Sequence, residues 1–338
     1  MSRLIRRRHS KRFAGVIVAP ALTLLASCAG NFGTTPQEVP AAAARPHPAW
    51  YRAAPALIKQ GSYVAEYFTN AILGYAGNNK SNLPPICSIA ATFVVDVATD
   101  PFGDLIDPDG GSKTVSVFHG PAMCGAKLGS FSDSAGQPSD AATHNARTGT
   151  IYVANIQAAG KPCGNVSVCT LAHGCGRVLS SSAIGGQLFA VAEDSNGNVY
   201  ASGYPNPSVS GPGSGASLVY WKNGTGKAAV VSAYRNSTPG GLDVDARGNL
   251  IAFDTFGRAV WVYTGCPAHC AAHGPFALKG ESVFGKVNAK NTMLQVADFE
   301  YGQVDVYQYN GTSGVRYLYS YNDGITPSGD VEGIALSP

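Results

Sequence analysis

The sequence predicts an all-β protein folded as a six-bladed β-propeller, on three observations. Short segments rich in β-branched and aromatic residues recur along most of the 338 residues. Tight turns that contain Asp and Gly separate these segments. Equivalent turn positions lie 44, 50, 51 and 45 residues apart, at Asp100, His144, Asp194, Asp245 and Lys290. A period of this size, with several strands in each unit, is typical of propeller blades rather than of solenoids.

The clearest repeat unit covers residues 240–263. Its first strand ends at residues 242–244. The turn from Asp245 to Gly248 follows, because Asp bonds back to the backbone and Gly accepts a positive φ. Residues 250–254 form the second strand, 255–257 turn again, and the β-branched and aromatic residues 259–263 form the third strand.

Weaker copies of this unit extend the prediction to the rest of the chain. Matching second strands lie at residues 63–66, 151–155, 199–202, 250–254 and 294–298. The third strands share a column that ends in an aromatic residue at Tyr75, Phe118, Trp221, Tyr263 and Tyr307, with Cys169 in the sixth place. Six blades are therefore expected.

The ring is expected to close by pairing the C-terminal strand with the N-terminal blade. Residues 329–336 resemble the start of a unit, and residues 62–75 resemble the rest of one. Their pairing would remove a sheet edge. The alternative is that residues 54–58 form the missing inner strand themselves.

The N-terminal segment predicts that the protein is exported from the cytoplasm. Residues 2–12 contain six Lys or Arg and no acid, residues 13–26 are apolar, and Leu25-Ala26-Ser27-Cys28 follows. This pattern resembles a bacterial lipoprotein signal peptide, which implies cleavage before Cys28 and acylation of Cys28. Because residue 29 is Ala and not Asp, the resemblance implies the periplasmic face of the outer membrane. The alternative is a plain secretory signal with a chance cysteine.

The expected organisation therefore has three parts. Residues 1–27 are the signal peptide, 28–60 are the lipidated cysteine with a flexible tether, and 61–338 are the propeller domain. Charged residues make up 13% of the chain, and much of the net charge of +3 lies in the signal segment. The mature protein is then close to neutral, and no basic stripe suggests nucleic acid as a partner.

Cysteine usage agrees with an oxidising compartment. Cys169 with Cys175, and Cys266 with Cys270, flank expected hairpin tips and are candidate disulfides. Neighbouring histidines also allow a metal site there. Cys87, Cys124 and Cys163 are left unassigned.

Polar residues at two sets of positions are candidates for a ligand or cation site at the channel mouth. Asp96, Asp140 and Lys286 occupy matching positions at the start of inner strands, and Glu332 lies one position earlier in its unit. The second set ends the second strands, at Glu66, Asn155, Asp254 and Asp298. Converging carboxylates bind cations or polar ligands. The alternative is that these side chains satisfy backbone groups in turns.

The repeats G-x-x-x-D-x-x-G-N-[LV] and V-x-V-Y resemble NHL-type or related six-bladed propeller repeats of bacterial lipoproteins. The resemblance covers residues 61–338 and implies a binding or protein-interaction module, with a protein or a small polar ligand as the partner.

The alternative is a metal-dependent lactonase or hydrolase of the gluconolactonase-like type, which uses a divalent cation in the channel. Glu332, Asn155, Asp254 and Asp298 are the right residue types, but their flanking sequences depart from that family, so its sites are not carried over. The sequence contains no nucleophile elbow, H-E-x-x-H motif or Walker loop, and no cofactor other than a possible divalent cation is expected.

Overall fold

The computed structural model describes residues 61–338 except 78, 121–123, 162, 206–214, 326–330 and 338. The expected signal peptide, Cys28 and the tether lie outside the described residues. Among the described residues, no helix has the length and apolar character needed to cross a membrane.

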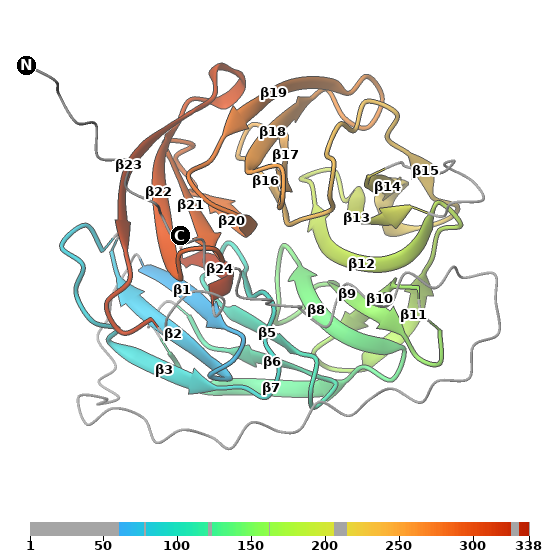
Figure 1. The fold of residues 1–338 in the computed structure, drawn as a ribbon. Coiled ribbons are helices and arrows are strands. Elements are labelled where there is room, and N and C mark those ends of the chain that lie inside the picture. Colours follow the sequence, from blue (N-terminus) through green and yellow to red (C-terminus); the bar gives the residue numbers. More distant parts are fainter. Residues whose placement is uncertain are drawn as a thin grey trace, which may run out of the picture.

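Six four-stranded antiparallel sheets form the domain and surround a common axis (Figure 1). The six-bladed propeller predicted from the repeats is therefore confirmed. Each blade has an inner, a second, a third and an outer strand. In this order, blade 1 contains β24 (Val331–Ser337), β1 (Gly61–Glu66), β2 (Ala71–Ala76) and β3 (Cys87–Ala90). Blade 2 contains β4 (Ala98–Thr99), β5 (Leu105–Asp109), β6 (Thr114–Phe118) and β7 (Lys127–Ser132).

The remaining blades follow in chain order. Blade 3 contains β8 (Gly136–Ala142), β9 (Ile151–Ala158), β10 (Asn165–Thr170) and β11 (Gly174–Leu179), and blade 4 contains β12 (Ile184–Glu193), β13 (Val199–Pro205), β14 (Ser217–Trp221) and β15 (Ala229–Val230). Blade 5 contains β16 (Leu242–Val244), β17 (Leu250–Asp254), β18 (Ala259–Thr264) and β19 (Ala271–Ala277). Blade 6 contains β20 (Ser282–Val287), β21 (Met293–Asp298), β22 (Gln303–Tyr309) and β23 (Val315–Tyr321).

The antiparallel order gives the ring two distinct faces. Turns between second and third strands, and loops from an outer strand to the next inner strand, lie on one face, called here the upper face. Turns between inner and second strands lie on the opposite, lower face. The core lies between the blades: Ile251 and Phe253 of β17 pack in one cluster with Leu294 and Val296 of β21. Second strands are buried on both sides, so they contain nearly continuous apolar runs.

The Asp-x-x-Gly repeats form the lower-face turns. One carboxylate oxygen of Asp245 accepts the backbone N–H groups of Arg247 and Asn249, both at 2.9 Å, and Gly248 has a φ of 80°. Asp194 makes the same pair of bonds to residues 196 and 198. The motif therefore recurs because the tight turn needs an acceptor at its start and a residue that tolerates positive φ near its end.

The aromatic column on the third strands secures the upper-face loops. The hydroxyl of Tyr263 accepts the backbone N–H of Arg235 at 3.0 Å, and the hydroxyl of Tyr307 accepts that of Lys279 at 2.8 Å. In each case, the tyrosine belongs to the blade that the loop is about to enter. Buried tyrosines need a polar partner for the hydroxyl, and the loops provide it.

The ring closes through β24, which is the inner strand of blade 1. It pairs antiparallel with β1, with Ile334 opposite Val64, and both side chains are fully buried. The predicted closure is confirmed, and β24 fills the position that residues 54–58 would have taken in the alternative.

Three disulfides link described residues. Cys169–Cys175 joins β10 to β11, and Cys266–Cys270 lies between β18 and β19. Their sulfur atoms are bonded to each other, so they are not available as the thiolate ligands that a metal site would need. The third, Cys87–Cys124, connects β3 of blade 1 to the loop before β7 of blade 2. It spans 37 residues, so it constrains the unfolded chain more than the two short loops do.

Candidate functional site

Four charged side chains of four different blades meet at the propeller axis. Asp96 precedes β4, Asp140 lies on β8, Asp243 on β16 and Lys286 on β20. Three of these, Asp96, Asp140 and Lys286, are expected from the aligned inner-strand positions. Asp243 is missed by the sequence reasoning. It lies two residues beyond Gly241, the aligned position of its blade, and therefore on the same side of the inner strand.

Each axial carboxyl group accepts a backbone N–H from a neighbouring blade. Asp96 accepts from Ile334 at 2.8 Å, Asp140 from Val191 at 2.9 Å, and Asp243 from Val287 at 2.7 Å. The same geometry thus joins blades 2 and 1, 3 and 4, and 5 and 6. These bonds cross from one blade to another, so the acids hold the inner strands in register around the axis.

Lys286 provides the positive charge at the axis. Its Nζ donates to the carbonyl of Leu242 at 3.2 Å and lies 3.9 Å from Oδ2 of Asp96. Burial alone would lower the pKa of Lys286, but Asp140, Asp96 and Asp243 together outweigh burial and raise it above its ordinary value. The side chain therefore remains an ammonium.

The pKa values of the three axial acids are raised above the ordinary value of an aspartate. Burial, reinforced by Asp140 and opposed by Lys286, raises the pKa of Asp96 well above its usual range. Burial also raises the pKa of Asp140, and it raises that of Asp243 to about 6, with Lys286 opposing it in both cases. The axis thus places three acids, whose ionisation is opposed by burial, around one ammonium.

This arrangement does not fit a divalent cation. A calcium or similar ion needs several oxygen ligands that converge on one point, and here the ammonium of Lys286 already lies among Asp96, Asp140 and Asp243. A second cation beside it would be repelled, since unit charges a few ångströms apart interact strongly in a poorly solvated site. No step of a reaction is therefore derived through a metal at this position.

The acids at the ends of second strands do not converge on the axis. Asp254 accepts the backbone N–H of Ser237 at 2.7 Å and the hydroxyl of Thr238 at 2.7 Å, both from the upper-face loop that enters its own blade. Asp298 accepts the N–H groups of Glu300 and Tyr301 in its own turn. Glu66 accepts the hydroxyl of Thr69 at 2.6 Å. These side chains satisfy turn and loop groups, as in the alternative that the sequence leaves open.

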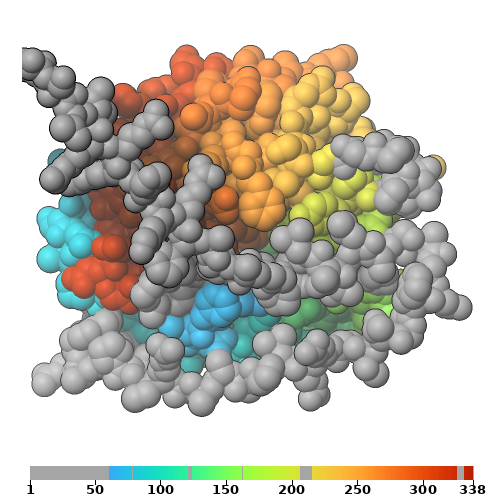
Figure 2. Space-filling model, viewed as in Figure 1, coloured from blue at the N-terminus to red at the C-terminus, as the bar shows by residue number. Residues whose placement is uncertain are grey.

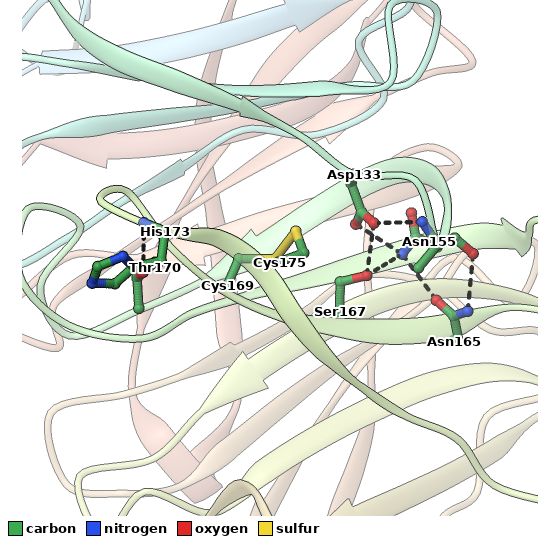
Figure 3. Close-up of a disulfide and its surroundings, with 9 residues drawn as sticks. Asp133, Asn155, Asn165, Ser167, Cys169, Thr170, His173 and Cys175 are labelled. Atoms are coloured by element: carbon green, nitrogen blue, oxygen red, sulfur yellow. Dashed lines mark hydrogen bonds between the residues drawn. A yellow bond between two sulfur atoms is a disulfide. The ribbon is translucent and has the colours of Figure 1, made fainter.

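Asn155 belongs to a buried polar network within blade 3 (Figure 3). Its amide nitrogen lies 3.1 Å from Asp133, 2.9 Å from Asn165 and 3.0 Å from Ser167. The hydroxyl of Ser167 donates to Asp133 at 2.9 Å. The other candidate second strands end in an acid, whereas β9 has Asn155 at this position. Asp133, in the loop before β8, supplies the carboxylate of this network. Asp133 also lies near Cys169 and Cys175, but those sulfur atoms form the disulfide drawn beside it in Figure 3.

Glu332 lies on β24 near the axis and faces a different partner. Burial raises the pKa of Tyr67 to about 12, and the charge of Glu332 adds to this effect. The ring of Tyr67 packs edge-on against Phe93, with centroids 4.8 Å apart. Glu332 therefore lies near an aromatic group of the upper face.

An exposed aromatic row on the upper face is a feature that sequence reasoning missed. Phe256 of blade 5, Tyr301 of blade 6 and Phe68 of blade 1 lie in the turns between second and third strands. Their exposed fractions are 56%, 49% and 59%. Blades 5, 6 and 1 are consecutive in the ring, whose sectors follow one another in colour order in Figure 2. The only sequence signal is an aromatic residue two or three positions after the second-strand acid.

Comparison with known proteins shows the fold alone. No family model and no curated protein matches the chain. A chain in the crystal structure of a nidogen/laminin complex is similar, with 13% identity and a TM-score of 0.59 over 82% of this chain and 98% of that chain. A protein of unknown function from Bacteroides caccae has 12% identity and a TM-score of 0.55, over 82% of this chain and 98% of its own. A functionally unknown protein from Desulfotomaculum acetoxidans DSM 771 has 12% identity and a TM-score of 0.53, over 81% and 83%.

Proposed function

We propose that this protein is a binding module of the bacterial cell envelope, held at a membrane by lipid on Cys28, that contacts its partner through the upper face of the propeller. One observation supports the binding role above the others. The axial acids bond backbone groups of neighbouring blades, and Asp254 and Asp298 bond their own loop or turn, whereas the aromatic row of the upper face is exposed. Exposed aromatic side chains on the loops of a rigid scaffold favour an interaction site on that face.

The anchor follows from the N-terminal pattern. Several acyl chains on Cys28 give stable attachment, which one chain does not. A tether of about thirty residues leaves the ring free to turn toward a partner. The outer-membrane location follows from Ala29 and belongs to the same proposal.

A metal-dependent lactonase receives less support. That chemistry needs a cation as Lewis acid. Propellers of the gluconolactonase-like type bind this cation in the channel, and in this protein Lys286 lies there. A chain with the same fold is present in the crystal structure of a nidogen/laminin complex, so the fold itself is compatible with a binding role.

Site-specific photo-crosslinking in cells tests the binding face. A photoreactive residue at position 256 should crosslink to a partner, whereas the same residue at position 102 should not. Phe102 is an equally exposed aromatic, at 59%, but lies in the lower-face turn between β4 and β5. Equal crosslinking at both positions, or none at either, would contradict the proposal.

The anchor has an independent test. Mass spectrometry should find a lipid on Cys28, and Cys28→Ala should release the protein from the membrane fraction or leave it unprocessed. A mutant that still sediments with membranes after a high-salt wash, together with an unmodified wild-type Cys28, would show that the anchor is wrong.

A further inference from the structure

The axial cluster brings a lysine amine, a carboxyl group and a second acid together in a buried place. Nζ of Lys286 lies 3.9 Å from Oδ2 of Asp96, and the two side chains are 14% and 0% exposed. Asp140 is fully buried and lies close enough to Asp96 for its charge to raise the pKa of that group. An amine nucleophile, a carboxyl group that it can attack and a group that can move protons are therefore neighbours.

The two oxygens of Asp96 have different surroundings. Oδ1 accepts the backbone N–H of Ile334 at 2.8 Å, which polarises it as a donor in an oxyanion hole does. Oδ2 is buried and has no hydrogen-bond partner among the described residues. Burial and the charge of Asp140 outweigh Lys286 and raise the pKa of Asp96, so the protonated form, which an amine can attack, is favoured. Oδ2 is therefore the oxygen that can leave.

The hydrogen-bond partners of an amide product are already in place. Nζ of Lys286 donates to the carbonyl of Leu242 at 3.2 Å, and an amide N–H at this position keeps that bond. The amide carbonyl, which is Oδ1 of Asp96, keeps the N–H of Ile334, and the unpartnered Oδ2 leaves as water. The product therefore has a partner for each polar group, and a buried ammonium is replaced by a neutral amide, which removes the cost of burying that charge.

We propose that Lys286 and Asp96 form an isopeptide bond across the propeller axis, with Asp140 as the acid–base group. The ammonium of Lys286 first passes one proton to the carboxylate of Asp140. The Nζ lone pair attacks Cγ of protonated Asp96, so that the Nζ–Cγ bond forms and the bond from Cγ to Oδ2 breaks. A second Nζ proton passes to Oδ2, which leaves as water, and Asp140 keeps the first proton. No further reactant is needed.

The bond joins blade 6 to blade 2 beside β24, the inner strand of blade 1. It links covalently the two parts of the ring that flank its closure. As with a disulfide between residues that are distant in sequence, such a link constrains the unfolded chain. The bond is independent of the proposed binding face, so the two proposals stand or fall separately.

Peptide mapping of the purified, folded full-length protein tests the proposal. After reduction and alkylation, trypsin should not cleave at Lys286, because its side chain is acylated. Residues 280–290 should appear joined to residues 81–113, lighter by one water than the sum of the two peptides. Lys279 is the matched internal control: its Nζ also lies 3.9 Å from an oxygen of Asp305, but its side chain is 41% exposed, so trypsin should cleave there normally.

Two variants test the chemistry of the bond. Lys286→Arg keeps the positive charge and should abolish the branched peptide, because the guanidinium stays protonated and is no nucleophile. Asp140→Asn keeps an oxygen for the backbone N–H of Val191. It should lower the branched fraction roughly tenfold or more, because the group that moves the protons is lost.

The proposal is overturned if the folded wild type yields Lys286 only with a free side chain. It is also overturned if residues 280–290 are joined to residues 128–147, because Asp140 would then be the group that is attacked. A branched fraction in Asp140→Asn equal to that of the wild type, at the same time after expression, would exclude Asp140 as the acid–base group.

Discussion

The ammonium of Lys286 lies 3.9 Å from the carboxyl group of Asp96 at the propeller axis, so a side chain of blade 6 meets one of blade 2 across the inner strand of blade 1. Asp140 and Asp243 complete this cluster. Because their oxygens also accept backbone N–H groups from neighbouring blades, the axis is a joint between blades. The same groups would otherwise be the natural ligands for a cation.

Replacing the axial ammonium tests this joint. Lys286→Met should lower the free energy of unfolding by about 3 kcal/mol, because it leaves the buried acids without their counter-charge. Millimolar calcium should then raise the melting temperature of the variant and leave that of the wild type unchanged. The double variant Lys286→Met with Asp96→Asn serves as the control. It should recover part of the free energy of unfolding that Lys286→Met loses. A Lys286→Met protein as stable as the wild type would show that the ammonium is not needed at the axis.

The two second-strand acids should respond differently to the same substitution. Asp254→Asn should cost about 2 kcal/mol, because Asp254 accepts bonds from both Ser237 and Thr238. Asp298→Asn should be neutral or stabilising above pH 7, since burial and the neighbouring Asp305 raise the pKa of Asp298 to about 7. Chemical denaturation of the two variants at pH 8 measures both effects. Equal losses in the two variants would contradict this reading of their partners.

Buried acids also predict the pH dependence of stability. Burial, with Asp109 adding to it, raises the pKa of Asp107 to about 7, and one oxygen of Asp107 has no hydrogen-bond partner. The folded state therefore binds this proton more tightly than the unfolded chain. That stability is fully present below the ordinary pKa of an aspartate, about 4, and is lost progressively as the pH rises to about 7.

The wild type should accordingly melt at a higher temperature at pH 5 than at pH 8. Asp107→Asn should raise the free energy of unfolding at pH 8 by about 1–2 kcal/mol and reduce the difference in melting temperature between pH 5 and pH 8. The control Asp323→Asn, at an exposed position, should leave this difference in melting temperature unchanged. Melting curves across this range decide the matter, and a wild type that is most stable at pH 8 would refute the assignment.

Ring closure predicts a large effect of a short truncation. Deleting residues 326–338 removes β24 and exposes the unpaired backbone and apolar side chains of β1, so cooperative unfolding should be lost or the protein should aggregate. Ile334→Val, which keeps the strand and removes one buried methylene, should cost only about 1 kcal/mol. Scanning calorimetry of both proteins measures this, and a truncated ring with an unchanged melting temperature would be incompatible with the role of β24.

Local patterns made much of the fold predictable. The turn at Asp245 and Gly248 and the strand Leu250–Asp254 follow from bonds and burial within a few residues. The closing strand was predictable because one repeat unit is divided between the two ends of the domain. Its first strand lies at the C-terminal end, and its remaining strands lie at the N-terminal end. Cys87–Cys124 was not, since nothing local indicates a bond between two blades.

The site was less predictable, because it depends on the closed ring. Asp96, Asp140 and Lys286 were found by alignment, but their mutual contact follows only when blades 2, 3 and 6 surround one axis. The strand-end acids looked like ligands because the sequence does not show that Asp254 bonds Ser237, 17 residues earlier, or that Asp298 bonds backbone groups of its own turn. The aromatic row has only a weak signal, an aromatic residue two or three positions after the second-strand acid, and this signal does not show that the rings are exposed.

The most direct test of the central claim is a hydrolysis assay of the purified protein. It uses simple lactones and esters, with and without calcium, magnesium, zinc or manganese. A propeller whose axis is taken by Lys286 and whose strand-end acids bond its own loops should show no turnover above background under any of these conditions. Metal-dependent turnover that disappears in Asp254→Asn or Asp298→Asn would contradict the account and identify the protein as an enzyme.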